Sequence, residues 1–100
     1  MGTIEVSNSN FTNNKGRAGT IGFFFFAEAT FENNNFINNE ATGKDNYLIE
    51  SMYSDTTFKN NYFENNTNNY RDMWSVNETS RSGGYDNPTM EGNTYIDNTL

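Results

Sequence analysis

Two acidic residues, Glu28 and Asp55, are the best candidates for chemistry, because each lies three residues before a phenylalanine of a repeated block. Two carboxylates on neighbouring strands could act on one substrate, as acid and base do in glycoside hydrolysis. The chain has no histidine and no cysteine, and so lacks the usual neutral-pH base and any thiolate. Both positions also suit polar residues at a turn that leads into a strand. We favour this second interpretation and predict no catalytic residue.

Asparagine side chains are the next candidates, because amide oxygens can bind calcium. At one turn position the repeats carry Asn13, Asn38 and Asn65, with a single acid, Asp97. Sites for hard cations need several converging carboxylates, which these turns do not supply. The asparagines are therefore expected to be structural, and neither a metal nor another cofactor is predicted.

Composition narrows the class of protein further. Six basic and thirteen acidic residues give a net charge of −7, and the basic residues are scattered singly, so no nucleic-acid partner is predicted. Apolar residues make up only 33% of the 100 residues, but 16% are aromatic, which is too many for a disordered chain. The sequence therefore predicts one small folded domain whose polar excess is asparagine.

Aromatic residues surrounded by asparagine recur at residues 11, 36, 63 and 95, at intervals of 25, 27 and 32. These four are Phe11, Phe36, Phe63 and Tyr95. Three residues after each comes an asparagine: Asn14, Asn39, Asn66 and Asn98. Five residues before each stands an apolar residue: Val6, Phe31, Phe58 and Met90. A nearly constant period indicates a solenoid, in which aromatic columns stack inside and asparagine ladders hold the turns.

The elements that position these columns are expected to be short strands. Thr3–Val6 and Thr30–Glu32 alternate apolar and polar residues between turns. A third strand between the blocks aligns Ile21 with Leu48, continuing through Phe26 and Tyr53. Three strands per repeat in constant order predict an all-β fold, a right-handed parallel β-helix of about three to four coils (approximately 3–27, 28–54, 55–86 and 87–100).

The third repeat breaks the period. We predict its third strand at Asp72–Val76, followed by an excursion from Asn77 to Asn87 that leaves the stack. Residue types typical of interfaces gather here, and the candidate partner-binding residues are Arg71, Trp74, Arg81 and Tyr85. Trp74 could instead fill the core of the third coil.

On the outside, an aligned column of Glu5, Glu32, Lys59 and Glu91 is interpreted as a solvated strand face. Thr30 over Thr57 is too short a threonine ladder for an ice-binding surface. No polar cap is evident at either end, so we expect a segment of a longer solenoid, or further coils or protein partners stacked on both ends. The first residues lack the features of a signal peptide, and the run Phe23–Phe26 is too short to cross a bilayer, so no membrane contact is predicted.

The repeated blocks resemble those of polymorphic outer-membrane-type proteins of the pectin lyase-like superfamily. The blocks that carry the resemblance are Phe11-Thr12-Asn13-Asn14, Phe36-Ile37-Asn38-Asn39 and Phe63-Glu64-Asn65-Asn66, with Gly16-Arg17-Ala18-Gly19-Thr20-Ile21 after the first. The second and third repeats depart from the pattern at Gly43–Leu48 and Tyr70–Trp74. The resemblance implies a β-helix and an extracellular or cell-surface location, and it implies no catalytic residue.

These observations together predict a non-catalytic structural or adhesive module of a cell-surface or extracellular assembly. The alternative is a fragment of a carbohydrate-active β-helix enzyme or a glycan-binding protein.

Overall fold

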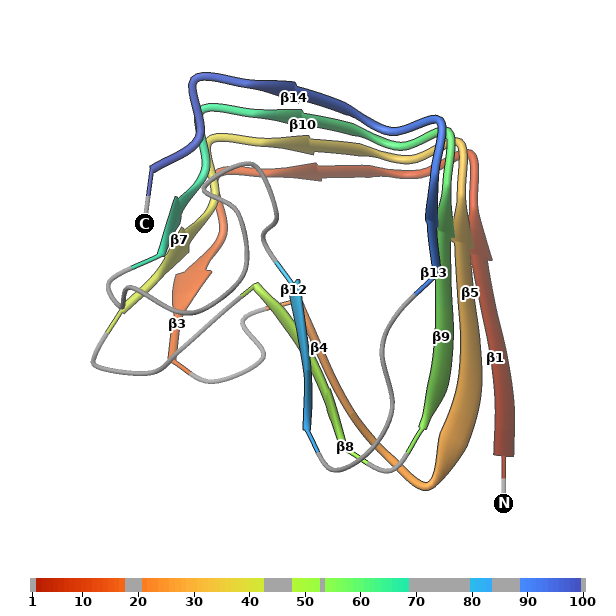
Figure 1. Cartoon of the computed structure of the whole chain (residues 1–100). Coiled ribbons are helices and arrows are strands. Elements are labelled where there is room, and N and C mark those ends of the chain that lie inside the picture. Colours follow the sequence, from red (N-terminus) through yellow and green to blue (C-terminus); the bar gives the residue numbers. More distant parts are fainter. Residues whose placement is uncertain are drawn as a thin grey trace.

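In the computed structural model, short parallel strands wind into successive coils around one axis (Figure 1). The structure describes residues 2–17, 21–42, 48–52, 54–68, 80–83 and 89–99. The first coil contains β1 (Gly2–Ser7), β2 (Asn10–Thr12), β3 (Lys15–Gly16) and β4 (Gly22–Phe25). The second contains β5 (Ala27–Glu32), β6 (Asn35–Ile37), β7 (Glu40–Ala41) and β8 (Ile49–Met52). The third contains β9 (Asp55–Lys59), β10 (Tyr62–Glu64), β11 (Thr67–Asn68) and β12 (Ser80–Gly83), and the last β13 (Thr89–Glu91) and β14 (Thr94–Ile96).

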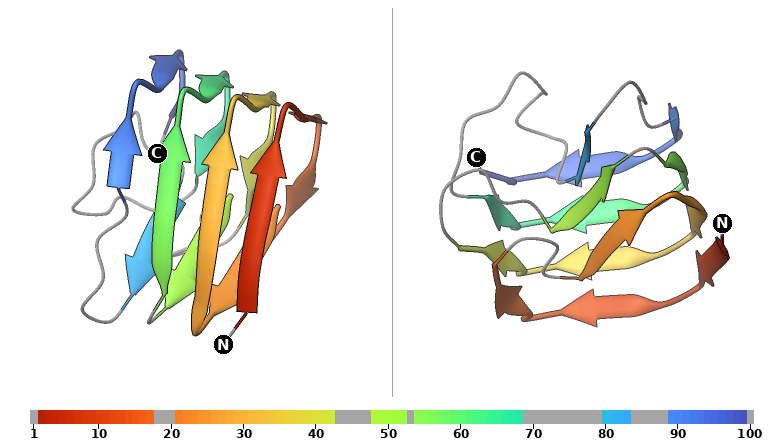
Figure 2. Two further views of the ribbon diagram at one scale, coloured as in Figure 1. Left: turned by 90° about the vertical axis from the view of Figure 1, so that its right-hand side faces the viewer. Right: turned by 90° about the horizontal axis from the view of Figure 1, so that it is seen from below.

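Each strand pairs with its counterparts in the neighbouring coils, and all of these pairings are parallel. The sheets have the orders β1–β5–β9–β13, β2–β6–β10–β14, β3–β7–β11 and β4–β8–β12. Figure 2 shows the coils stacked in chain order from β1 to β13, with the same right-handed turn in each coil. The predicted right-handed parallel β-helix is confirmed. Beyond the three predicted strands, each of the first three coils also has a two-residue strand, β3, β7 or β11, after the asparagine ladder position.

The register of the sheets confirms most of the predicted columns. Phe36 pairs with Phe11 on one side and Phe63 on the other, and Phe63 pairs with Tyr95. Phe31 likewise lies between Val6 and Phe58. Glu28 pairs with Asp55 and Thr30 with Thr57, as predicted. Tyr53, the predicted partner of Phe26, lies outside the described residues.

Two predictions of register were wrong. The strand that pairs with β8 in the third coil is β12, at Ser80–Gly83, so part of the predicted excursion lies in the stack. The predicted strand at 72–76 lies outside the described residues. On the outer face, Glu5 pairs with Thr30, and Ser7 is the residue in line with Glu32. Glu5 therefore lies two residues before the position in line with Glu32, and because side chains alternate along a strand it still points to the same outer face as Glu32.

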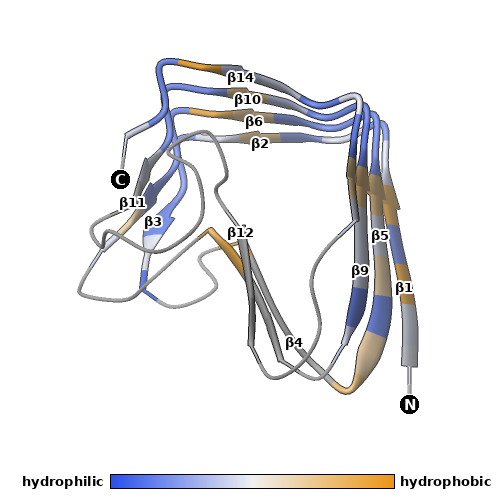
Figure 3. Ribbon diagram, in the orientation of Figure 1, coloured by the Kyte–Doolittle hydropathy of each residue, from blue (hydrophilic) through white to orange (hydrophobic). Residues whose placement is uncertain are grey.

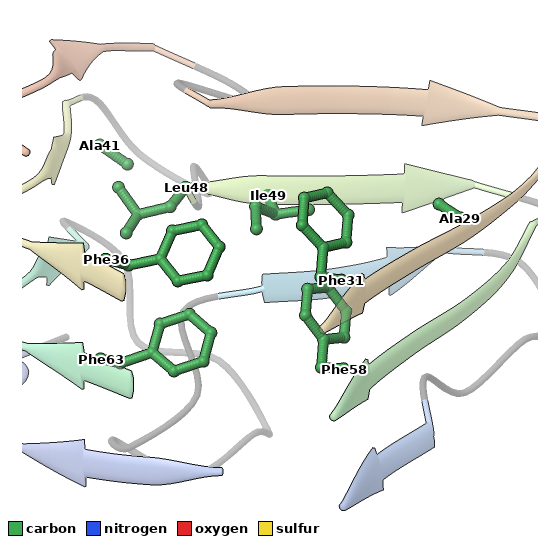
Figure 4. Packing of buried hydrophobic residues seen from close by; sticks show 8 residues of the cluster. All are labelled: Ala29, Phe31, Phe36, Ala41, Leu48, Ile49, Phe58 and Phe63. Atoms are coloured by element: carbon green, nitrogen blue, oxygen red, sulfur yellow. The ribbon is translucent and has the colours of Figure 1, made fainter. Parts of the chain in front are cut away.

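Phenylalanine stacks occupy the space between the sheets (Figure 4). Ring centroids are 5.1 Å apart in Phe11–Phe36 and 4.6 Å apart in Phe36–Phe63, and the rings of each pair are nearly parallel. Phe31 and Phe58 form a second stack at 5.1 Å, and Phe31 meets Phe36 at 6.3 Å with the rings tilted by 53°. All four phenylalanines of the middle coils are at most 1% exposed. Burial of each such ring contributes about 1.5–3 kcal/mol, which makes these stacks the main apolar stabilisation of the coils.

Small and branched aliphatic residues fill the rest of this core. Ala29 and Ala41 are buried on β5 and β7, and Leu48 and Ile49 close the space at the start of β8. Figure 3 shows apolar residues recurring at the same place in stacked strands, with hydrophilic residues at the corners between them. Since a solenoid coil repeats its neighbours, one inward column of each sheet is enough to continue the core.

Candidate functional site

Left-handed backbone marks the two corners that flank the sheet of β2, β6, β10 and β14. At the first corner Asn8, Asn33, Asn60 and Gly92 have φ between 52° and 66°. At the second corner Asn13, Asn38, Asn65 and Asp97 have φ between 53° and 60°. Asparagine, aspartate and glycine tolerate this conformation better than other residues, because the short polar side chain bonds locally or is absent. The asparagine-rich turns are therefore a backbone requirement that repeats in every coil.

The residue after each left-handed residue at the second corner forms the predicted asparagine ladder. The backbone N–H and the side-chain amide of Asn39 both donate to Asn66 Oδ1, each at 3.0 Å. Asn14 makes the same pair of bonds to Asn39 Oδ1. Asn39 Nδ2 also donates to the carbonyl of Phe11 in the preceding coil, at 2.9 Å. The amides of Asn39 and Asn66 thus each bridge three coils, and both residues are at most 1% exposed.

A second ladder at the first corner was not predicted. Asn34 donates from its backbone N–H and its side chain to Asn61 Oδ1, and Asn61 does the same to Asn93 Oδ1. Ser9 begins this ladder with a backbone bond to Asn34 Oδ1. The sequence carries the signal, because Asn34, Asn61 and Asn93 each follow a turn residue just as Asn14 follows Asn13. Ser9 breaks the column in the first coil, which concealed it.

A third corner, between β4 and β5, uses the same geometry with different residues. Phe26 has a φ of 52°, followed by Ala27, whose backbone N–H donates to Ser54 Oγ at 3.0 Å. Ser54 therefore does in the next coil what an asparagine amide does at the other corners. Phe26 is also 53% exposed. A bulky residue held in left-handed backbone and open to solvent marks this corner as strained.

Acidic side chains cover the outer face of the sheet formed by β1, β5, β9 and β13. Glu5, Glu28, Asp55 and Glu91 are exposed, and Lys59 lies between Glu32 and Glu91 in one column. A shallow hollow of about 140 Å³ on this face is lined by Glu5, Val6, Ser7, Thr30 and Glu32. It forms where Ser7 and Thr30 place short side chains beside longer glutamates. The face is exposed and negatively charged. Lys59, between Glu32 and Glu91, limits the repulsion between carboxylates in that one column only.

Glu28 and Asp55 lie side by side on this face, and both are exposed. Exposed carboxylates on adjacent strands point the same way from the sheet, whereas glycoside hydrolysis places its two carboxylates on opposite sides of the scissile bond. Within the described residues, no three acidic side chains are placed to hold a metal ion. Nor does that part of the chain include a helix long and apolar enough to cross a membrane.

The predicted partner-binding residues fall mostly outside the described residues. Arg71, Trp74 and Tyr85 lie there. Arg81 lies in β12, where its backbone pairs with Glu50 of β8. These four residues are thus not brought together by the described part of the structure, and their role stays a prediction.

One titratable group on the face of β2, β6, β10 and β14 has a shifted pKa. The Tyr62 hydroxyl donates to the Glu64 carboxylate, and this bond holds the proton on the phenol. That hydrogen bond, with smaller contributions from burial and from the charges of Glu64 and Asp97, raises the pKa of Tyr62 above its ordinary value of 10.0. The phenol stays neutral at physiological pH and serves to hold Glu64 against the strand face.

Comparison of the chain with protein-family models, with curated proteins and with solved structures gives no match. The assignment to a β-solenoid therefore rests on the parallel register, the asparagine ladders and the stacked aromatic rings.

Proposed function

We propose that this chain is a non-catalytic structural or adhesive β-solenoid module of a cell-surface or extracellular assembly. The main support for the proposal is that the buried asparagine side chains form hydrogen bonds between coils. Buried amides at Asn34, Asn39, Asn61 and Asn66 bond to the coils before and after them, so these groups hold the stack rather than a ligand. The buried asparagines therefore stabilise the fold and are not available to bind a ligand.

The outer surfaces support the same proposal. The outer face of β1, β5, β9 and β13 presents rows of serine, threonine and acidic side chains, and the hollow at Glu5 and Glu32 is open to solvent. Such a surface suits contact with another macromolecule, because its backbone is already ordered by bonds between the coils and little backbone entropy is lost on binding. The likeness of the repeats to polymorphic outer-membrane-type proteins adds the cell-surface part of the proposal.

A second candidate is a carbohydrate-active or glycan-binding β-helix, favoured by the exposed pair Glu28 and Asp55. In that case the pair would act on an acidic or neutral polysaccharide lying across the outer face of β5 and β9. Because the chain has no histidine, the described groups able to transfer a proton on that face are these carboxylates, Glu32 and Lys59.

Polysaccharide assays distinguish the two candidates. Purified chain is incubated with acidic and neutral polysaccharides, and both reducing ends and unsaturated products are measured, beside Glu28→Gln and Asp55→Asn variants. The structural module predicts no release above buffer and no difference among the three proteins. Cleavage by the wild type that either variant abolishes, while its unfolding midpoint is unchanged, would overturn the proposal in favour of the enzyme.

A further inference from the structure

The asparagine ladders run in one direction along the stack. In every step the residue of the earlier coil donates from its backbone N–H, and in the asparagine steps also from its side-chain amide, to the Oδ1 of the next coil. The Nδ2 group also donates backwards to a carbonyl of the preceding coil. The series of bonds to Oδ1 therefore ends in an Oδ1 acceptor at the first coil and in backbone N–H donors at the last.

The last coil presents the donor end. Asn93 and Asn98 accept from Asn61 and Asn66. Their own backbone N–H groups donate to nothing in the described part of the chain. Each Nδ2 also bonds back to one carbonyl, of Phe58 or Phe63, leaving its second hydrogen without a bond to the described residues. In every earlier coil, the corresponding N–H donates to an Oδ1 of the next coil. At this end, the N–H groups of Asn93 and Asn98 lack such an acceptor among the described residues.

The first coil presents the acceptor end at one corner. Asn14 uses its N–H and Nδ2 as donors to Asn39, and its Oδ1 accepts no bond from the described residues. At the other corner Ser9 replaces asparagine, and its hydroxyl donates to the Ser7 carbonyl. The two corners thus differ: the Asn14 corner is open for a further coil, and the Ser9 corner is partly closed by its own hydroxyl.

Apolar columns and charge also match between the two ends. Val6 and Phe11 at one end, and Met90 and Tyr95 at the other, are half-buried, although the same columns are buried in the middle coils. Among described residues the first coil carries Lys15 and Arg17 against Glu5, and the last carries only the acids Glu91 and Asp97. Extending the register by one coil sets Glu91 against Ser7, Asp97 against Asn13 and Thr99 against Lys15, with no like charges opposed.

We infer that a second copy of this chain stacks head to tail on the first, with the Asn93 and Asn98 end of one on the Asn14 end of the next. This inference rests on the proposed structural role. Two copies joined by the same ends would oppose donors to donors or acceptors to acceptors, so a closed two-fold dimer through the ends is disfavoured. A head-to-tail contact leaves both outer ends free, and repetition of it gives an open filament.

Disulfide trapping tests the polarity, because the chain has no cysteine of its own. Thr12 and Ile96 belong to one outward column, through Ile37 and Glu64, so a head-to-tail junction sets Ile96 beside Thr12 of the next copy. Adjacent parallel strands lie about 4.8 Å apart, within the Cα separation that a disulfide spans. Mixing Thr12→Cys chains with Ile96→Cys chains under a thiol–disulfide buffer should yield the mixed dimer well above either symmetric dimer.

The matched control mixes Thr12→Cys with Thr57→Cys, which lies in a middle coil on another face. We expect this mixture to give the statistical ratio of products. A statistical ratio for the Thr12 and Ile96 mixture as well, or an excess of either symmetric dimer, would overturn the inference.

Sedimentation velocity at increasing concentration provides the independent measurement. Wild-type chain should show a continuous rise in mean sedimentation coefficient past the dimer. Thr99→Lys opposes Lys15 across the junction and should raise the concentration for half-association about two- to fivefold at low salt, whereas Thr99→Glu should lower it by a similar factor. Thr57→Lys makes the same change of net charge away from the ends and should have no effect.

A monomer at every concentration, with all variants alike, would refute the stacking while leaving the structural proposal intact. Cleavage of a polysaccharide in the assay above would instead refute the structural proposal, whatever the state of association. The two failures are therefore distinguishable.

Discussion

The asparagine corners and the corner at Phe26 both place a residue in left-handed backbone and bond the next residue to the following coil, but they use different side chains. At the asparagine corners a left-handed residue that suits the conformation is followed by an amide that bonds to the coils on either side. At the third corner the left-handed residue is Phe26, and the bridging group is the single hydroxyl of Ser54. At each corner, a side-chain oxygen of the next coil accepts a bond from the backbone N–H that follows the left-handed residue. An asparagine side chain also donates to a backbone carbonyl of the previous coil.

The largest effect is expected from Asn66→Ala. The Asn66 side chain accepts two bonds from Asn39 and donates one each to Phe36 and Asn98, all at 2.9–3.0 Å. Its removal takes bonds from buried groups in the coils on both sides, at about 1–3 kcal/mol for each partner left unpaired. We expect a loss of at least about 3 kcal/mol in the free energy of unfolding, measured by denaturant titration.

Asn35→Ala is the control for that experiment, because the Asn35 amide bonds to Asn10 on the exposed face. It should change the free energy of unfolding by less than about 0.5 kcal/mol. Equal losses in the two variants would show that asparagine content, rather than the ladder, stabilises the coils.

At the third corner, Ser54→Ala removes one acceptor from one buried N–H. A loss of about 1–2 kcal/mol is expected, smaller than for Asn66→Ala because Asn66 accepts two bonds and donates two between coils, whereas Ser54 is the acceptor of one buried backbone N–H. The control is Ser7→Ala at an exposed position, which measures the effect of changing serine to alanine where no buried bond is lost. If Ser54→Ala destabilises as strongly as Asn66→Ala, the third corner contributes as much as an asparagine corner, and the contrast drawn above fails.

Phe26→Asn should stabilise the chain, because it puts at the third corner the residue type found at the other two. Left-handed backbone disfavours most L-residues by about 1–2 kcal/mol, and Asn tolerates it. Since Phe26 is about half exposed, the loss of its ring contacts is expected to be smaller than this gain. We predict a rise of about 1 kcal/mol in unfolding free energy, seen as a higher melting temperature.

Phe26→Val is the matched variant, because a β-branched residue disfavours this conformation further. It should lower the melting temperature. Destabilisation by both Phe26→Asn and Phe26→Val would mean that ring contacts, not backbone strain, dominate at this position.

The smallest effect concerns Tyr62, which lies on the sheet between the two asparagine corners. Because its pKa in the folded chain is raised above 10.0, the stabilisation from its bond to Glu64 is present below pH 10 and is lost as pH rises through the folded-state pKa. Absorbance titration of wild type minus Tyr62→Phe should give a tyrosine with a raised pKa, and Glu64→Gln should lower it. An identical titration in Glu64→Gln would show that the carboxylate does not set the shift.

Repetition made the asparagine corners readable from the sequence. One residue type at one place in four repeats, as with Asn14 and its counterparts, identifies a position without any knowledge of contacts. The same argument missed the ladder through Asn34, because Ser9 interrupts the column and the neighbouring asparagines of each block look alike. The predicted column of Glu5 with Glu32 is two residues out of register, although the alignment of Val6 with Phe31 already sets Glu5 opposite Thr30.

The third coil shows where local pattern fails altogether. Its sheet is continued by Ser80–Gly83, a segment with no apolar residue to mark it, whereas the sequence pattern favours a strand at 72–76. Parallel pairing is satisfied by the backbone, so a polar strand can take the place in the sheet if the coils before it present an open edge. This open edge is formed by the preceding coils, so it cannot be predicted from the strand propensity of the segment that pairs with it.

The order of strands, the inward aromatic columns and the asparagine turns were determined by the sequence itself, because each is a local choice repeated at a nearly constant interval. At the first corner, the tertiary structure alone decided which of two adjacent asparagines bridges the coils and which takes left-handed backbone. It also decided that Ser54 serves the third corner, and that the ladders point one way along the stack. These properties depend on the donor or acceptor that lies one coil away, about 25–32 residues along the chain, and appear only once the coils are in register.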